Sequence, residues 1–195
     1  MRIAGLILAG GEGRRMGADK ALLPLAGKPL IEHVIERLAP QLDCLAISAN
    51  GDPERFDDYG VPVLPDLPGE AGQGPVAGLR AGLAWAEEEE ADVLVTVATD
   101  TPFLPADLVE RLAAPDDLAY ATHAGRAHYT AALWPLTMGF VVDALYATGE
   151  RRLRALLDGA VAVKFPGAED PFANLNTAED LAAAEARLAA RPGAR

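Results

Sequence analysis

The sequence predicts an α/β fold, a single-domain three-layer α/β/α sandwich built on a mostly parallel sheet. Short apolar runs alternate with segments of helical periodicity, which is the pattern of doubly wound sheets. At 195 residues the chain has the usual size of one domain and can bury a sizeable core. It contains no internal repeat and no linker-like stretch, so we expect one domain over residues 1–195, with 191–195 frayed.

The first half of the chain alternates strands and helices. Apolar runs short enough for buried parallel strands lie at 3–9, 45–49, 61–64 and 92–98. Apolar residues recur at the i, i+3, i+4 spacing of one helical face over 31–42 and again over 76–86. The order strand, helix, strand, strand, helix, strand favours a parallel sheet with helices on both faces.

The second half of the chain is predicted to be mixed. Helices are expected at 107–112, 138–146 and 151–157, and strands at 118–122, 128–133 and 161–165. A turn at Gly125 separates the first two of these strands. Thr177, with Asp180 three residues later, predicts a capping box that opens a terminal helix, although Asp replaces the usual Glu or Gln.

Composition excludes several classes of protein. The chain carries 17 Lys and Arg residues against 29 Asp and Glu, and its net charge of −12 repels nucleic acids and anionic membranes. No apolar stretch approaches the roughly 18 residues of a membrane span. Cys44 is the only cysteine, so no internal disulfide can form. We therefore expect a soluble, cytoplasmic protein that binds neither nucleic acid nor membrane.

Ligands of such sheets bind beyond the carboxyl ends of the parallel strands. The loops at these ends are expected at 10–20, 50–53, 66–78 and 100–102. The first loop combines glycines, whose bare backbone amides can approach an oxyanion, with basic side chains. The glycines are Gly10, Gly11, Gly13 and Gly17, and the basic residues are Arg14, Arg15 and Lys20. This combination predicts a phosphate-binding loop.

The loop differs from two well-known phosphate loops. The dinucleotide fingerprint requires a third glycine where this chain has Met16, and a P-loop requires Gly-Lys-Ser/Thr, whereas Lys20 follows Asp19. The negative net charge does not exclude an anionic ligand, because distant carboxylates are screened beyond about 8–10 Å. A cation within ~4 Å of a phosphate contributes on the order of 1–4 kcal/mol. The attraction of nearby cations to a phosphate therefore outweighs the repulsion from the distant carboxylates.

Asp100 adds an acidic group to the same edge of the predicted sheet. It follows the strand at 92–98 and precedes Pro102, so its carboxylate should face the glycine loop. Magnesium is bound by one or two carboxylates together with water and substrate phosphates. Asp100 is therefore the candidate metal ligand, and Mg²⁺ is the expected cofactor. His123 and His128 lack a visible third ligand, so a structural role is favoured for them.

Several short motifs follow one another along the chain. They are LAGG at 8–11, RMG at 15–17, DK at 19–20, GKPL at 27–30, SAN at 48–50, GPVAG at 74–78, DTPFLP at 100–105, ALW at 132–134 and FANLNT at 172–177. In this order and spacing they resemble the molybdenum cofactor guanylyltransferases of the nucleotidyltransferase superfamily. The resemblance covers nearly the whole chain and implies a Rossmann-like, nucleotide-diphospho-sugar transferase-like fold. The opening motifs belong to the whole superfamily, whereas GPVAG and NLNT narrow the match.

The resemblance implies transfer of GMP from GTP to molybdopterin, with release of pyrophosphate. The positions that match the family's GTP-binding residues are Leu8, Ala9, Gly10, Lys20, Asn50, Asp66 and Asp100. Asp100 also matches the family's magnesium ligand. Gly11 and Gly74 extend the predicted GTP site as neighbouring backbone. Val76 and Ala178 depart from the commonest family pattern, outside the expected chemistry.

The expected reaction brings two anions together, so cations and amide donors should dominate the catalysis. We assign Arg15 and Lys20 to the triphosphate and Asp100 to the metal, as the candidate catalytic residues. No general base is needed, because the attacking phosphate is ionised at neutral pH. Candidates for binding the acceptor are Arg151, Arg152, Asn174 and Asn176, which could instead be solvated or cap turns.

Other functions stay open at this point. A sister nucleotidyltransferase would use CTP, on molybdopterin or on a sugar or alcohol phosphate, although Gly10-Gly11 favours guanine by resemblance. A non-catalytic nucleotide-binding module would keep the loop, but the carboxylate of Asp100 would repel phosphates without a metal. A dinucleotide oxidoreductase is excluded by Met16. Molybdoenzymes or other cofactor-biosynthesis proteins are the expected transient partners, and the oligomeric state stays open.

Overall fold

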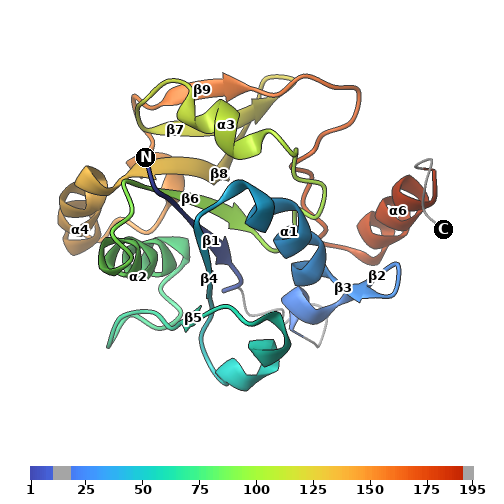
Figure 1. Ribbon diagram of the computed structural model, residues 1–195, viewed down its shortest axis with the longest axis horizontal. Helices are drawn as coiled ribbons and strands as arrows, with labels where there is room; N and C mark the ends of the chain where they lie inside the picture. The colour runs from blue at the N-terminus through green and yellow to red at the C-terminus, as the bar shows by residue number, and fades with distance from the viewer. Residues whose placement is uncertain (11–18, 191–195) are drawn as a thin grey trace.

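The computed structural model describes residues 1–10 and 19–190 and has the predicted three layers (Figure 1). A seven-stranded sheet, in the order β5-β4-β1-β6-β8-β7-β9, forms the middle layer. The parallel part consists of β1 (Ile3–Leu8), β4 (Cys44–Ser48), β5 (Val63–Leu64) and β6 (Val93–Ala98). These strands confirm the apolar runs of the first half of the chain.

The register brings the carboxyl ends of the parallel strands to one edge of the sheet. Leu8, the last residue of β1, pairs with Ser48 of β4 and with Ala98 of β6. Ser48 pairs in turn with Leu64 of β5. The loops that follow these strands therefore begin next to one another, as predicted.

The other half of the sheet is mixed. β8 (Arg126–Pro135) runs antiparallel to both β6 and β7 (Ala119–His123), and β9 (Val161–Lys164) runs parallel to β7. Ala124 and Gly125 join β7 to β8 with φ values of 47° and 82°. Two positive φ values in a two-residue loop are the requirement of a type I′ hairpin turn. The turn predicted at Gly125 is confirmed.

One face of the sheet is covered by α1 (Leu30–Leu38) and α3 (Leu108–Ala113). Their apolar residues share one core with Ile7 and Val95 of the central strands. The helix predicted over 31–42 stops being α-helical after Leu38, because Pro40 cannot continue it and a 3₁₀ turn, η2 (Ala39–Gln41), follows.

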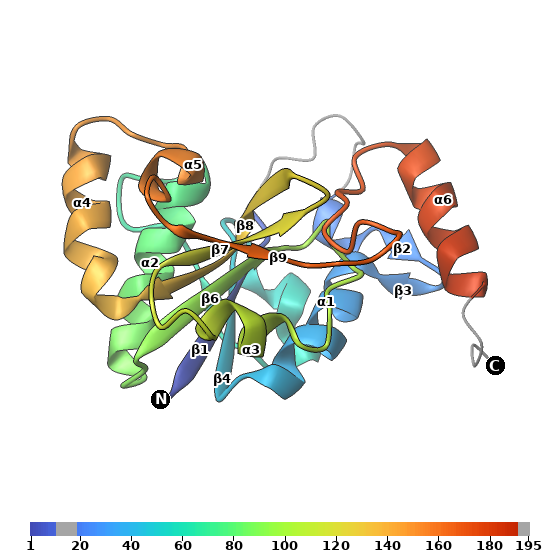
Figure 2. The same ribbon diagram turned by 90° about the horizontal axis from the view of Figure 1, so that it is seen from above.

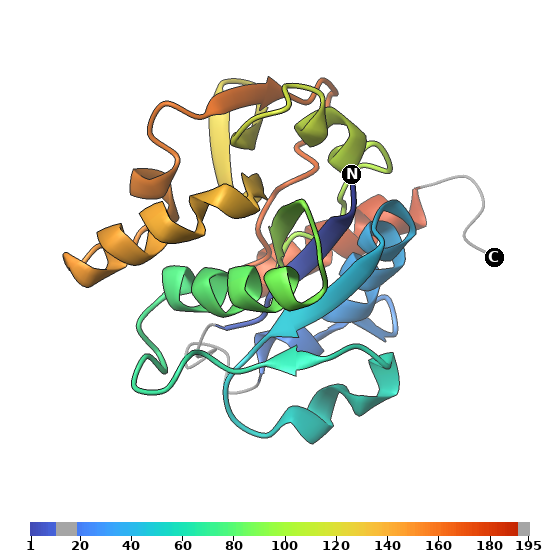
Figure 3. The same ribbon diagram turned by 60° about the vertical axis from the view of Figure 1, so that its left-hand side comes forward.

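The opposite face is covered by α2 (Pro75–Glu88), α4 (Gly139–Ala147) and α5 (Leu153–Leu156). These helices share a second core with Leu6 and Trp134. α2 and α4 lie side by side (Figure 3). A further 3₁₀ turn, η4 (Leu136–Met138), leads into α4, and the helix predicted over 151–157 is confirmed only as the single turn α5.

Two glycines allow α2 to pack very close to the sheet. A Cβ on Gly78 would lie 2.4 Å from Oγ of Ser48, and one on Gly82 would lie 2.4 Å from Cδ2 of Leu6. Both distances are shorter than real carbon contacts allow, so a side chain at either position would force Ser48 or Leu6 to move. This close approach places Gly74 and the first turn of α2 beside the carboxyl edge of β4.

The sequence analysis missed several short elements at this edge. They are the 3₁₀ turns η1 (Lys20–Leu22) and η3 (Pro53–Tyr59) and the small hairpin of β2 (Pro24–Leu25) and β3 (Lys28–Pro29). The predicted terminal helix is α6 (Ala178–Ala189), which lies beside this hairpin and away from α4 and α5 (Figure 2). Its capping box between Thr177 and Asp180 is confirmed.

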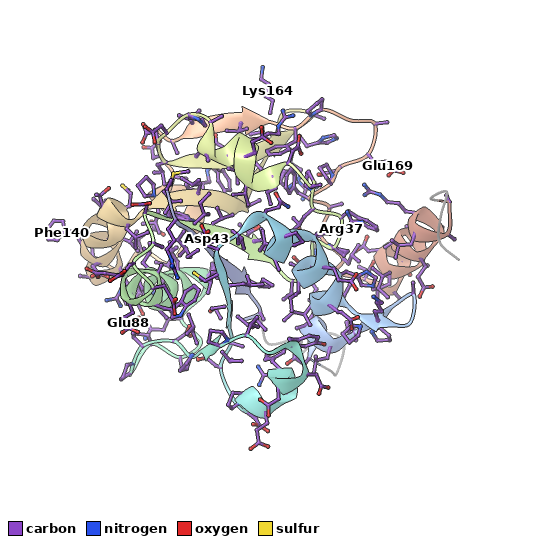
Figure 4. All side chains as sticks on the ribbon, viewed as in Figure 1. Arg37, Asp43, Glu88, Phe140, Lys164 and Glu169 are labelled. Carbon is purple, nitrogen blue, oxygen red and sulfur yellow. The ribbon has the colours of Figure 1, made fainter. Side chains whose placement is uncertain are left out.

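Side chains fill the space between the layers, whereas Phe140 on α4 and Lys164 at the end of β9 point away from the sheet (Figure 4). Phe140 is 83% exposed. No helix within 1–10 and 19–190 is long and apolar enough to cross a membrane.

Candidate functional site

The centre of the candidate site is an ion pair between Lys20 and Asp100. Lys20 is the first residue of η1, whose amide at Ala21 donates to Oδ1 of Asp19 at 3.1 Å. Asp100 lies just beyond β6. Nζ of Lys20 is 2.6 Å from Oδ2 of Asp100, and the two side chains are only 22% and 14% exposed. The end of the glycine loop and the end of β6 therefore meet, as the sequence predicted.

The segment that leads to α6 closes over this pair. Nδ2 of Asn174 donates to Oδ1 of Asp100 at 3.0 Å, and the amide of Leu175 donates to the backbone carbonyl of Asp100 at 2.9 Å. Lys20 also donates to Oδ1 of Asn176 at 2.6 Å. Asn174 and Asn176, proposed from the sequence as acceptor contacts, thus belong to the same cluster as Lys20 and Asp100.

The capping box of α6 holds this segment in place. Oδ2 of Asp180 accepts hydrogen bonds from the amides of Asn176 and Thr177, at 2.8 Å and 2.9 Å. The Asn176 amide lowers the pKa of Asp180 most, followed by the side chain and then the amide of Thr177. The carboxylate stays ionised and anchors Asn176 beside Lys20.

The cluster offers oxygen ligands suited to a hard cation. The ammonium of Lys20 already bridges two oxygens, Oδ2 of Asp100 and Oδ1 of Asn176, as a cation between them would. Among the described residues no group of three or more His, Cys, Asp or Glu gathers to bind a metal. A single carboxylate with amide oxygens fits magnesium that completes its coordination with phosphates and water.

A second polar cluster lies across the neighbouring loops. Asn50, after β4, donates through Nδ2 to Oδ2 of Asp66 at 2.7 Å, and its Oδ1 accepts the Asp66 amide at 3.0 Å. The amide of Gly72 donates to the same Asp66 oxygen at 3.1 Å. Two residues predicted to bind GTP are therefore in direct contact. Oδ1 of Asp66 makes no hydrogen bond with another described residue.

Arg55 joins the two clusters and was missed by the sequence analysis. Its guanidinium contacts Asp19, which precedes Lys20, and also the backbone carbonyl of Asn50. No motif or spacing marks Arg55 in the sequence, because its charged partner, Asp19, comes from the distant loop that follows β1. Its position just after the strand-end loop at 50–53 is the one feature of the sequence that could have drawn attention to it.

The other predicted GTP-binding residues lie at the expected edge. Leu8 ends β1, and the amide of Ala9 donates to the Ser48 carbonyl at 2.9 Å. A Cβ on Gly10 would meet nothing within 4 Å among the described atoms. Gly74 has a φ of 91° and precedes the first turn of α2. Gly11 and Arg15 lie outside the described residues.

Arg151 and Arg152 do not join the cluster around Asp100. Arg151 stacks 3.6 Å from the ring centroid of Tyr146, and its Nε and Nη2 donate to Oε1 of Gln73. Arg152 is exposed and paired with Glu150, and this contact, together with the amides of both arginines, lowers the pKa of Glu150 to about 2. Neither arginine makes a hydrogen bond or ion pair with Lys20, Asp100 or the two asparagines. α5 and α6 lie at opposite sides of the molecule (Figure 2).

The two histidines have the structural role that the sequence favoured. Nδ1 of His123 is 2.9 Å from the carbonyl of Phe165, and Nε2 of His128 lies 3.3 Å from Oδ2 of Asp170. Both rings are buried. Burial lowers the pKa of His128 more than the neighbouring Asp170 raises it.

The fold and the cluster together define a class of protein. A doubly wound sheet carries, at the carboxyl edge of its parallel strands, a lysine, a carboxylate and amide groups, which is where such proteins bind nucleotides and other phosphate ligands. The model of the MobA-like NTP transferase domain matches residues 5–164. The chain belongs to this family of nucleotidyltransferases.

Individual relatives agree with the family. The chain is 63% identical over 188 residues to the molybdenum cofactor guanylyltransferase of Rhodobacter capsulatus, covering 96% of this chain and 97% of that protein. The enzyme of the same name from Cereibacter sphaeroides is 52% identical, with 96% and 98% covered. The crystal structure of molybdopterin-guanine dinucleotide biosynthesis protein A from Archaeoglobus fulgidus superposes with a TM-score of 0.73 at 25% identity, covering 98% of this chain and all of that one.

Proposed function

We propose that this protein transfers GMP from GTP to molybdopterin, releasing pyrophosphate and forming the guanine dinucleotide cofactor. The observation that carries the proposal is the contact of Lys20 with Asp100, flanked by Asn174 and Asn176, at the nucleotide-binding edge of the sheet. The molybdenum cofactor guanylyltransferase that shares 63% of its residues with this chain supports the choice of substrates.

Lys20 and Asp100 have different electrostatic roles in this proposed reaction. Lys20 would neutralise the triphosphate and the charge that develops on the leaving pyrophosphate. Arg15, outside the described residues, is assigned the same role. Asp100, with Asn174 fixing one of its oxygens, would hold Mg²⁺. When bound, that ion would supply charge neutralisation between the nucleotide and the acceptor phosphate.

Asp66 supports guanine as the base. Oδ1 of Asp66, which makes no hydrogen bond within the described part of the chain, is an acceptor, and the edge of guanine presents two neighbouring N–H donors. Cytosine presents one donor beside an acceptor nitrogen, which a carboxylate would repel. Asn50 holds Asp66 through two hydrogen bonds, so the carboxylate is fixed before a nucleotide arrives. The amides beside Gly10 and Gly74 complete the proposed nucleotide site.

Asn174 and Asn176 are better placed than the arginines to meet the acceptor. They adjoin the catalytic pair, where the acceptor phosphate must approach. The donors of Arg151 are already engaged by Gln73 and by the Tyr146 and Glu150 carbonyls. Arg152 would be an outer contact for the acceptor. The protein would also make transient contacts with molybdoenzymes or other cofactor-biosynthesis proteins.

The test is an assay of the purified protein with molybdopterin, Mg²⁺ and each nucleoside triphosphate in turn. Pyrophosphate and the guanine dinucleotide should form with GTP only. In Asp100→Asn we expect a fall in kcat on the order of 100-fold, as for loss of one electrostatic contact to the transition state. Asp107→Asn, which weakens only a surface pair with Arg111, is the matched control and should match the wild type.

Three outcomes would overturn the proposal. Release of pyrophosphate with CTP but not GTP would assign the protein to the cytidylyl group. Binding of GTP without any release would make it a nucleotide-binding module. An unchanged rate in Asp100→Asn would remove Asp100 from the chemistry.

A further inference from the structure

Arg55 holds two ligand loops together with one side chain. It lies in η3, and each of its three guanidinium nitrogens contacts an oxygen from a different residue. Nη2 donates to the carbonyl of Asn50 at 2.7 Å and Nη1 to the carbonyl of Asp52 at 2.8 Å. Nε lies 2.8 Å from Oδ2 of Asp19, as an ion pair without the direction of a hydrogen bond.

The surroundings of Arg55 are built for this arrangement. The guanidinium stacks 4.7 Å from the ring centroid of Phe56, which is fully buried. A Cβ on Gly51 would lie 3.1 Å from Nη1, and Gly51 has a φ of 87° that other residues rarely adopt. Glycine at this position therefore leaves the space that the guanidinium occupies. Only 24% of the Arg55 side chain is exposed.

Through Asp19, Arg55 is connected to the lysine that we propose is catalytic. Asp19 divides its carboxylate: Oδ1 accepts the amide of Ala21 and caps η1, and Oδ2 faces Arg55. Because η1 begins with Lys20, the place of Asp19 sets where the lysine side chain starts. From there, Nζ of Lys20 reaches Asp100.

Through Asn50, Arg55 is connected to the loop proposed to bind the base. The Asn50 carbonyl accepts from Arg55, while the Asn50 side chain holds Asp66. A continuous series of contacts thus runs from Lys20 through Asp19, Arg55 and Asn50 to Asp66.

We propose that Arg55 is a positioning residue that sets the distance between the catalytic lysine and the base-binding loop of the nucleotide site. Its catalytic consequence rests on the function proposed above, but its effect on η1 does not. The arginine fork is required, because an ammonium is a point charge that cannot meet three oxygens in fixed directions.

The first test uses Arg55→Gln, Arg55→Lys and Asp19→Asn. Asp19→Asn breaks only the lysine side of the series, so kcat should fall about 10-fold or more with the KM for GTP changed less than about 3-fold. Arg55→Gln breaks both sides, so kcat should fall as much and the KM for GTP should also rise. Arg55→Lys should show the same fall in kcat and rise in KM as Arg55→Gln. The double variant should be no worse than Arg55→Gln by more than about twofold, because the two residues act through one contact.

The second test needs no substrate. Hydrogen–deuterium exchange of the amides over residues 20–23 should speed up in Arg55→Gln and Asp19→Asn, although these residues lie far from position 55 in the sequence. Arg2→Gln is the matched control, because Arg2 forms an ion pair with Glu89 at the other, N-terminal end of β1. It should leave both exchange and kinetics at the wild-type level.

The proposal fails if Arg55→Lys keeps wild-type kinetics, which would leave a role for charge alone. It also fails if exchange over 20–23 stays unchanged in Arg55→Gln. A wild-type protein without turnover of GTP and molybdopterin would instead refute the proposed function, and the exchange experiment would still decide the role of Arg55.

Discussion

Lys20 is the residue on which most of the candidate site converges. Its ammonium contacts a carboxylate from the end of β6 and an amide oxygen from the segment before α6, and its backbone belongs to a turn capped by Asp19. Glycine and lysine at a strand end predict a phosphate site at this edge, and the structure places Lys20 there beside Asp100. The partners of Lys20 were only partly predictable, because Asn176 lies 156 residues further along the chain.

At the same scale, Lys20→Met should lower kcat on the order of 100-fold, because the variant loses the preorganised cation that we propose faces the triphosphate. Steady-state release of pyrophosphate at saturating GTP measures the effect. Lys28→Met is the control, since Lys28 pairs with Glu32 and Glu36 on the surface, and it should keep the wild-type kcat. A Lys20→Met protein with wild-type kcat would show that the lysine only balances the charge of Asp100.

Residues also mark the limit of what the sequence could predict. The arginines at 151 and 152 were expected to bind the acceptor because a basic cluster is typical of anion sites. In the structure the donors of Arg151 meet Gln73 and two backbone carbonyls. Its role toward the acceptor stays a prediction, as do the roles of Gly11 and Arg15, which lie outside the described residues.

At the scale of elements, α2 depends on its glycines. Gly78→Ala would place a methyl group 2.4 Å from Oγ of Ser48, so the Ser48 side chain, the helix or the strand must shift. We expect a loss of about 1–3 kcal/mol in the free energy of unfolding, the usual cost of overpacking, measured by urea denaturation. Ser48→Ala in the same chain should recover part of the loss, because the Ser48 Cβ lies 3.4 Å away, within ordinary contact distance.

Gly139→Ala provides the control for this prediction. Gly139 opens α4 and a Cβ there would meet nothing within 4 Å, so the substitution should be neutral or slightly stabilising. Equal destabilisation by the two substitutions would contradict the packing argument and indicate a general effect of replacing glycine.

The capping box of α6 makes a second prediction for an element. The pKa of Asp180 is lowered in the folded protein, so its carboxylate stabilises the fold above the ordinary pKa, and this stabilisation is lost as the pH falls through the lowered value. Asp180→Asn should therefore unfold at lower urea than the wild type at pH 7, and the difference should shrink below about pH 4. Glu179→Gln, next to it and without a hydrogen bond to another described residue, should show no such dependence. A gap between Asp180→Asn and wild type that stays constant with pH would refute the role of the carboxylate.

For the whole molecule, the three layers of sheet and helices could be predicted from the sequence. The contacts between loops at the candidate site could not. Buried parallel strands are read from apolar runs and covering helices from periodicity, since both patterns are local. The hairpin of β2 and β3 was missed because its strands are two residues each and its turn uses Ala26 and Gly27, at φ values of 50° and 83°. The bridge made by Arg55 was missed because it joins Asp19 to the loop of Asn50 and Asp52, and these two segments meet only in the folded chain.

The family model ends at residue 164, yet Asn174 and Asn176 lie beyond it and touch Asp100 and Lys20. All seven strands of the main sheet end by Lys164, whereas both amide partners of the ion pair come from the segment after it. A fragment cut at residue 164 would therefore carry the strands by which the family is recognised, and it would lack both side-chain amides that hold Lys20 and Asp100.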